Sequence, residues 1–150
     1  MANFTVYSFL DVAATIVGTN GVISLGSSSG NAEEGIAVAF AEDQVTTTIG
    51  ADGTGMHSIH GGQSGVVTVR LLKSSPTNAA LNAMYAADRA VPSSGGQNTI
   101  VVTWLTGGDV ITAKQCAFTK FPDEAYGKVG AVLEWRFNAV YITPILGAGV

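Results

Sequence analysis

Apolar and polar residues alternate along much of the chain with the two-residue period of a β-strand. In residues 35–42, Ile36, Val38 and Phe40 fall on one face and small residues such as Ala37 fall on the other. Glycine and serine interrupt the pattern about every ten to twenty residues, so the chain is expected to be mainly β, an antiparallel β-sandwich or barrel of about seven or eight strands. The other expected strands are residues 12–17, 22–25, 45–49, 66–72, 99–104, 110–121 (with a bulge) and 129–142.

The same parity assigns side chains to faces, because a strand buries one face and turns the other to solvent or to a neighbouring molecule. The expected inward residues of the two most regular strands are Val67, Val69, Leu71, Leu133, Trp135, Phe137 and Tyr141. The polar residues on the opposite faces are Gln44, Thr46, Thr48, Thr68, Arg70, Glu134, Arg136 and Asn138.

One α-helix is predicted, over residues 77–89. Ser75 is a natural N-cap, and Pro76 suits the first helical position because its missing N–H would have no partner there. Pro92 ends the pattern. The apolar stripe that should pack on the outside of the sheet is Ala80, Leu81, Met84 and Tyr85.

Residues 50–65 hold six glycines and show little periodicity, which predicts a long loop. Loops of this length in compact domains are usually functional or disordered. The apolar residues Met56 and Ile59 are unexpected in a loop that remains exposed. The loop residues of interest are Asp52, Gly53, Thr54, Gly55, Met56, His57, Ser58, Ile59 and His60.

The composition favours a chain that covers its surface with other copies of itself. Only 12% of the residues are charged, against roughly 25% in ordinary soluble domains. The net charge of −4 argues against tight binding of nucleic-acid phosphates. Cys116 is the single cysteine, so no internal disulfide framework is expected. Neither a signal peptide nor a membrane-spanning helix is predicted.

The search for catalytic or metal-binding chemistry gives no strong candidate. His57 and His60 have a spacing that suits one metal ion, but the third ligand is missing, which favours two polar loop residues. Glu33 and Glu34 are adjacent on a strand and should point to opposite faces. Cys116 is expected to be a buried structural thiol. No catalytic residue, metal or cofactor is therefore expected.

Two other function classes are weighed against self-assembly. A carbohydrate-binding or adhesin module would expose aromatic residues, yet Trp104 and Trp135 occupy strand positions that predict a core. A hydrolase using His57 and His60 lacks a Gly-x-Ser-x-Gly nucleophile motif or any comparable pattern.

Four stretches in order along the chain resemble phage tail tube proteins. They are Tyr7-Ser8-Phe9-Leu10-Asp11-Val12, Glu33-Glu34-Gly35-Ile36, residues 48–58 and, most specifically, residues 65–78 with a strand ending in Leu71-Leu72 before Ser75-Pro76-Thr77-Asn78. The resemblance covers essentially all of residues 1–150, as a single tail-tube domain.

The resemblance implies a structural virion protein rather than an enzyme. Its copies would form hexameric rings that stack into the hollow inner tube of a contractile tail, assembled in the host cytoplasm, through which phage DNA is delivered. The expected partners are other copies, the tail sheath, tape-measure and baseplate or terminator proteins, and DNA only in transit, without sequence specificity or membrane insertion. The alternative is the inner tube of a related contractile system, such as type VI secretion or a tailocin.

In such a tube the polar strand faces should line the channel or the seam between subunits, with the exterior of the tube as the alternative. Arg70 and Arg136 should be offset by acidic partners such as Glu134, because unpaired arginines would bind DNA phosphate. The glycine-rich loop should be mobile in an isolated subunit and order against a neighbouring subunit or ring.

Overall fold

The computed structural model describes residues 4–27, 30–93 and 95–149. It has one α-helix, α1 (Thr77–Ala90), and a short 3-10 helix (Phe9–Asp11) among these residues. The mainly β prediction is confirmed. The strands are β1 (Val12–Gly18), β2 (Gly21–Ser24), β3 (Asn31–Phe40), β4 (Val45–Ile49), β5 (Gly55–Ile59), β6 (Gly65–Leu72), β7 (Asn98–Trp104), β8 (Asp109–Phe118), β9 (Val132–Ala139) and β10 (Tyr141–Ile145).

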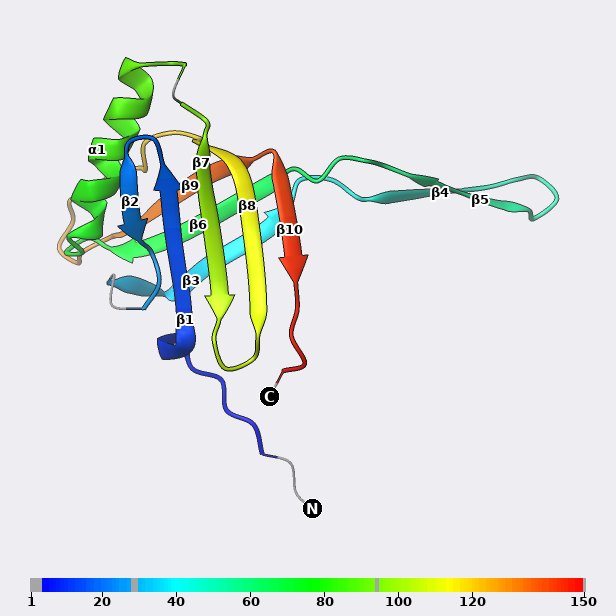
Figure 1. Cartoon of the computed structure of the whole chain (residues 1–150), viewed down its shortest axis with the longest axis horizontal. Helices are drawn as coiled ribbons and strands as arrows, with labels where there is room; N and C mark the ends of the chain where they lie inside the picture. Colours follow the sequence, from blue (N-terminus) through cyan, green and yellow to red (C-terminus); the bar gives the residue numbers. More distant parts are fainter. Residues whose placement is uncertain (1–3, 28–29, 94, 150) are drawn as a thin grey trace.

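Eight of the strands form a curled antiparallel sheet that packs on itself as two layers. The strand order is β2-β1-β7-β8-β9-β6-β3, and β10 also pairs with β8. Figure 1 shows β2, β1, β7, β8 and β10 in one layer, with β9, β6 and β3 crossing behind them. The expected orientation of the Glu33 and Glu34 side chains in β3 lies outside the described residues.

Strand β8 belongs to both layers. Its first part pairs with β10, whereas Ala117 and Phe118 pair with β9. Between these parts, the register with β7 shifts by one residue and Gln115 has a φ of 54°. This confirms the predicted bulge, which turns the strand from one layer into the other.

The prediction of one strand over residues 129–142 is wrong, because the chain changes layers at Val140. The Val140 N–H donates to the Lys114 carbonyl at 3.2 Å, between the end of β9 and the start of β10. Ala139 and Ile142 are both buried, so the alternation changes phase. Tyr141 is therefore exposed rather than in the core.

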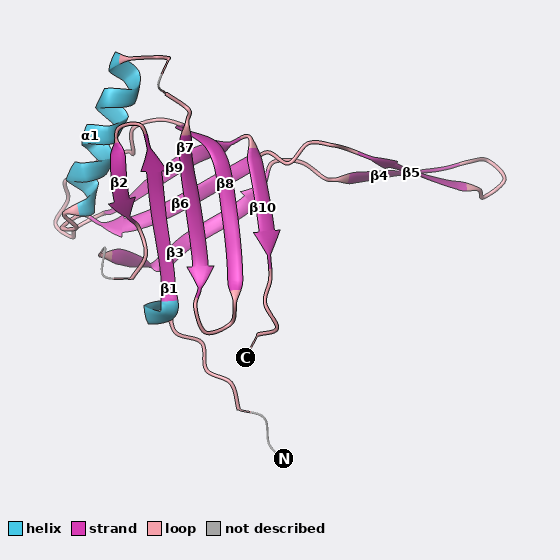
Figure 2. Ribbon diagram, in the orientation of Figure 1, coloured by secondary structure: helices cyan, strands magenta, loops and turns pink. Residues whose placement is uncertain are grey.

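The prediction of a structureless loop over residues 50–65 is also wrong. Strand β5 pairs with β4, and the two form a hairpin that projects from the sandwich (Figure 2). A tight turn closes its tip: the Gly50 N–H donates to the Thr54 carbonyl at 2.7 Å, and Gly53 has a φ of 89°. We call residues 44–60 the arm.

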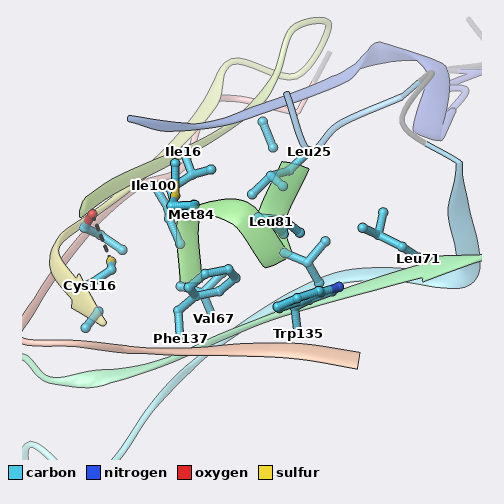
Figure 3. Close-up of a cluster of buried hydrophobic side chains, with 14 of the residues drawn as sticks. Ile16, Leu25, Val67, Leu71, Leu81, Met84, Ile100, Cys116, Trp135 and Phe137 are labelled. Atoms are coloured by element: carbon cyan, nitrogen blue, oxygen red, sulfur yellow. Dashed lines mark hydrogen bonds between the residues drawn. The ribbon is translucent and has the colours of Figure 1, made fainter. Parts of the chain in front are cut away.

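The core lies between the two layers and beneath α1 (Figure 3). The strand residues expected inside are buried, apart from Tyr141. Leu81 and Met84 of α1 are buried and Tyr85 is half-buried, as expected for a helix on the outside of the sheet, whereas Ala80 is exposed. Cys116 is buried, and its Sγ donates to the Ala113 carbonyl at 3.4 Å.

Two side chains fix the start of α1. The Ser75 Oγ accepts a hydrogen bond from the Thr77 N–H at 3.3 Å, although the N-cap position is held by Pro76 and not, as predicted, by Ser75. Asn78 donates through Nδ2 to the Leu72 carbonyl at 2.9 Å and accepts at Oδ1 from Trp135 Nε1 at 3.1 Å. The sequence Ser75-Pro76-Thr77-Asn78 thus connects the end of β6, the helix and β9.

Within the described residues, α1 is too short and too polar for a transmembrane helix, and no other helix qualifies.

Candidate functional site

Five of the eight polar residues predicted to share a surface lie together on the outer side of the sheet. Arg70 of β6 stands opposite Glu134 of β9, and Thr68 stands opposite Arg136. Asn138 follows on the same side of β9, opposite Val66. Cross-strand partners project to the same face of a sheet. We call the surface of Thr68, Arg70, Glu134, Arg136 and Asn138 the polar face.

Glu134 is the centre of the charges on the polar face. Its Oε2 lies 3.5 Å from Arg70 Nε, and its Oε1 lies 2.7 Å from Arg136 Nη2. Arg136 also donates through Nε to the same Oε1 at 2.7 Å. The prediction that Glu134 offsets both arginines is confirmed.

Burial differs across the polar face. Thr68 is only 9% exposed, and Arg70 and Glu134 are half-buried, whereas Arg136 and Asn138 are exposed. The face continues onto β3, where Ala37 stands opposite Thr68. The surface beside β6 is therefore lined by small side chains.

Gln44, Thr46 and Thr48 lie elsewhere. Gln44 precedes β4, and the other two belong to β4, so all three are on the arm and not on the polar face. Gln44 Nε2 donates to the Gly62 carbonyl at 2.8 Å at the base of the arm. The alternation along the strand correctly predicted that these residues face away from Val45, Thr47 and Ile49. It does not indicate which sheet the strand joins.

The two histidines do not converge. His57 Nδ1 hydrogen-bonds with Thr47 Oγ1 at 2.9 Å on one side of the arm, and His60 Nε2 hydrogen-bonds with Thr46 Oγ1 at 2.7 Å on the other. In the described part of the chain, no group of three or more His, Cys, Asp or Glu side chains is placed to hold a metal ion.

The arm carries apolar side chains that have no cover within the subunit. Val45, Ile49, Met56 and Ile59 are 46%, 64%, 59% and 83% exposed. A two-stranded hairpin is at best marginally stable alone in water. The arm is thus a part of the described chain that requires contact with another molecule.

Strand β3 is an end strand of the curled sheet, so one of its edges has no neighbour within the described sheet. Its neighbour β6 is not an edge, because it lies between β9 and β3. Natural proteins usually protect an edge with charge or proline. Along the described side chains of β3 from Gly35 to Phe40 there are only small and apolar residues.

A half-open pocket of about 290 Å³ beside β3 was not foreseen from the sequence. Its walls include Tyr7, Phe9, Gly35, Ile36 and Trp104. Trp104, expected in the core, is only half-buried; its ring lies edge-on to Tyr7 at 5.5 Å. The apolar residues near the N-terminus, in the sequence Phe4-Thr5-Val6-Tyr7, were the available signal.

Comparison with known families identifies the chain. A family profile described as Bacteriophage PhiTE tail tube protein matches residues 4–147. The chain belongs to this tail tube family. The tail tube protein is accordingly a structural component of a phage tail. Comparison with curated proteins gives no match.

Solved structures similar to the tail tube protein share its fold at low sequence identity. The anti-feeding prophage tube-terminating cap has a TM-score of 0.57 and 13% identity, covering 98% of this chain and 95% of its own. A chain from the tail of an empty GTA particle, refined with C6 symmetry, has a TM-score of 0.57 and 12% identity, covering 95% of this chain and 100% of its own. A chain of the PVC extracellular contractile injection system sheath-tube complex has a TM-score of 0.54 and 11% identity, covering 89% and 88%.

Proposed function

We propose that copies of this tail tube protein form hexameric rings that stack into the hollow inner tube of a contractile tail, through which phage DNA passes. The observation that carries the proposal is the combination of an uncovered apolar arm with an open edge strand in one subunit. Both features need another protein surface, and neighbouring copies supply it at a fixed position.

The open edge of β3 accounts for closure of the ring. Around a ring, β3 of one subunit lies beside the opposite end of the same layer in the next subunit, where β8 pairs with only part of β9. Backbone pairing across this seam joins the layers of six copies into one closed barrel, which removes the edges. C6 symmetry in the GTA tail supports the ring number.

The polar face then lines the channel, and the arm contacts an adjacent subunit or the next ring. Residues 52–60 form part of the tip turn and the returning strand of the arm, and the turn between Gly50 and Thr54 lies farthest from the body (Figure 1). We expect this segment to be mobile in an isolated subunit and to become ordered on contact.

Sheath, terminator and baseplate proteins are the proposed partners outside the tube, with a tape-measure protein inside it during assembly in the host cytoplasm. Similar folds occur in a sheath-tube complex, a sheath/tube terminator and a baseplate. Two of these neighbours come from an extracellular contractile injection system, which supports the alternative of a tube in a phage-tail-like injection system.

Imaging the purified protein by negative-stain electron microscopy tests the proposal. We expect rings or hollow tubes without any added cofactor, and six-fold symmetry in end-on class averages. A protein that remains monomeric at high concentration, by light scattering and by imaging, would contradict it. Packaged DNA in the purified particle distinguishes the phage from the injection system.

A further inference from the structure

Glu134 engages both arginines of the polar face at once. Arg70 approaches one carboxylate oxygen, and Arg136 directs two nitrogens at the other. The three side chains come from neighbouring positions on β6 and β9, so the backbone register holds them together.

Folding stability does not account for this arrangement. The side chains of Arg70, Glu134 and Arg136 are 26%, 37% and 57% exposed, and ion pairs at such sites contribute little to stability. The long arginine stems can cover the surface of a sheet while their charged ends stay at the solvent. The guanidinium groups at the ends of these stems remain positively charged. On a surface that must not bind nucleic acid, a nearby carboxylate has to neutralise that charge.

We propose that Glu134 prevents the polar face from binding the phosphate backbone of nucleic acid. This inference rests on the proposed function, in which the polar face lines the channel. A guanidinium binds carboxylate and phosphate through the same N–H donors. An arginine already held by Glu134 therefore has fewer donors and less net charge to offer a passing phosphate.

The cations near Glu134 are also paired with carboxylates. Glu134 and Arg136 line a hollow of about 400 Å³ together with Lys120 and Asp123. Lys120 Nζ lies 3.6 Å from Asp123 Oδ1, so each cation of this hollow faces a carboxylate. Loss of Glu134 would free Arg70 and Arg136 together, because both side chains form their ion pairs with it.

Heparin chromatography of the unassembled subunit tests the role of Glu134 without depending on the tube. Glu134→Gln should elute at a higher NaCl concentration than the wild type. The matched control is Asp43→Asn, which removes one negative charge at an exposed position before the arm and should elute earlier than Glu134→Gln. Equal elution of these two variants would overturn the proposal, because the effect would then be one of net charge alone.

Two further variants keep the test decisive. Glu134→Ala removes both the charge and the hydrogen-bond acceptor of the side chain. Of Glu134→Gln and Glu134→Ala, the variant that keeps the wild-type thermal melt can be used. The triple variant Arg70→Gln, Glu134→Gln, Arg136→Gln should lose the added retention. If the triple variant stays as strongly retained as Glu134→Gln, the two arginines do not bind the polyanion and the proposal fails.

Sedimentation of assembled tubes with a fluorescent duplex oligonucleotide separates this inference from the proposed function. Glu134→Gln tubes should retain the duplex, and wild-type tubes should not. With two phosphates neutralised per subunit, a fourfold rise in salt should weaken retention on the order of tenfold. If the variant subunit binds heparin but its tubes exclude the duplex, the role of Glu134 stands and the placement of the polar face in the channel is wrong.

Discussion

Leu81 illustrates how a single residue attaches the helix to the sandwich. It is fully buried in the core cluster, against which Tyr85 and Phe118 pack with their ring centroids 5.6 Å apart. We expect Leu81→Ala to lower the free energy of unfolding by about 2–5 kcal/mol, because it leaves a cavity under the helix. Ala80→Ser, at the exposed neighbouring position, should change it by no more than about 0.5 kcal/mol. Urea denaturation measures both, and equal midpoints would show that the helix stripe is misassigned.

Cys116 makes the stability depend on pH at the alkaline end. Burial raises the pKa of the Cys116 thiol from 9.0 to about 11. Above pH 9 the unfolded chain gains a thiolate that the folded chain resists, so stability falls as the pH rises from 9 to 11. The loss attributable to this thiol is about 2 kcal/mol at pH 11.

Comparison of the wild type with Cys116→Ala isolates this contribution. The variant should be less stable at neutral pH because of the lost packing, but its free energy of unfolding should decline less steeply between pH 9 and 11. Denaturant titrations at several pH values give both slopes. Parallel slopes would mean that the thiol has the same pKa in both states.

At the scale of elements, the arm can be removed without cutting into the core. The His60 N–H donates to the Gln44 carbonyl at 2.8 Å, so the two ends of the arm are adjacent. Replacing residues 45–59 with a short Gly-Ser linker should leave a folded subunit, because the arm contributes no residue to the hydrophobic core.

The same replacement should abolish tubes if the arm joins neighbouring copies. Circular dichroism and thermal melting check the fold, and electron microscopy checks assembly. The milder pair Ile49→Ser and Ile59→Ser, on one side of the arm, should weaken assembly with no change in the melt. Normal tubes from the linker variant would contradict the proposed role of the arm.

Sequence periodicity predicted those elements whose pattern is set by the core. Val67, Val69 and Leu71 alternate because β6 is buried on one side, and α1 has a stripe because it covers the sheet. Within the arm, residues 45–49 alternate and were predicted as a strand, whereas residues 55–59 carry no alternation that could reveal their partner strand. The break at Val140 was missed because a phase change needs no glycine or proline to mark it.

The candidate site was predictable to a similar extent. Parity placed Thr68, Arg70, Glu134 and Arg136 outside the core, and opposite charges in such positions attract one another across strands. Their gathering into one surface depends on β6 pairing with β9, a long-range contact that local sequence does not encode. For the same reason, Thr46 and Thr48 were grouped with them although they lie on the arm.

At the scale of the whole molecule, two double variants decide which surface meets DNA. Thr68→Lys with Asn138→Lys adds charge to the polar face, whereas Thr46→Lys with Thr48→Lys adds the same charge to the arm. If the polar face lines the channel, the first pair should impair DNA passage, because added cations bind phosphate.

Infectivity of phage carrying each pair, together with micrographs of the tails, provides the measurement. Phage with the double lysine variant of the polar face should assemble tails but deliver DNA poorly. Any effect of the double lysine variant of the arm should be on tail assembly. Failure of delivery with intact tails for the arm pair alone would place Thr46 and Thr48 in the channel instead.

The sharing of β8 between the layers has a mechanical consequence. The sandwich is joined by continuous backbone along β8, as Figure 1 shows, but on the other side β3 faces β1 across the pocket lined by Tyr7 and Phe9. We expect an isolated subunit of this shape to open more readily between β3 and β1 than at β8. In the proposed tube the edge of β3 pairs with the next subunit, so assembly itself would hold the open side of each subunit closed.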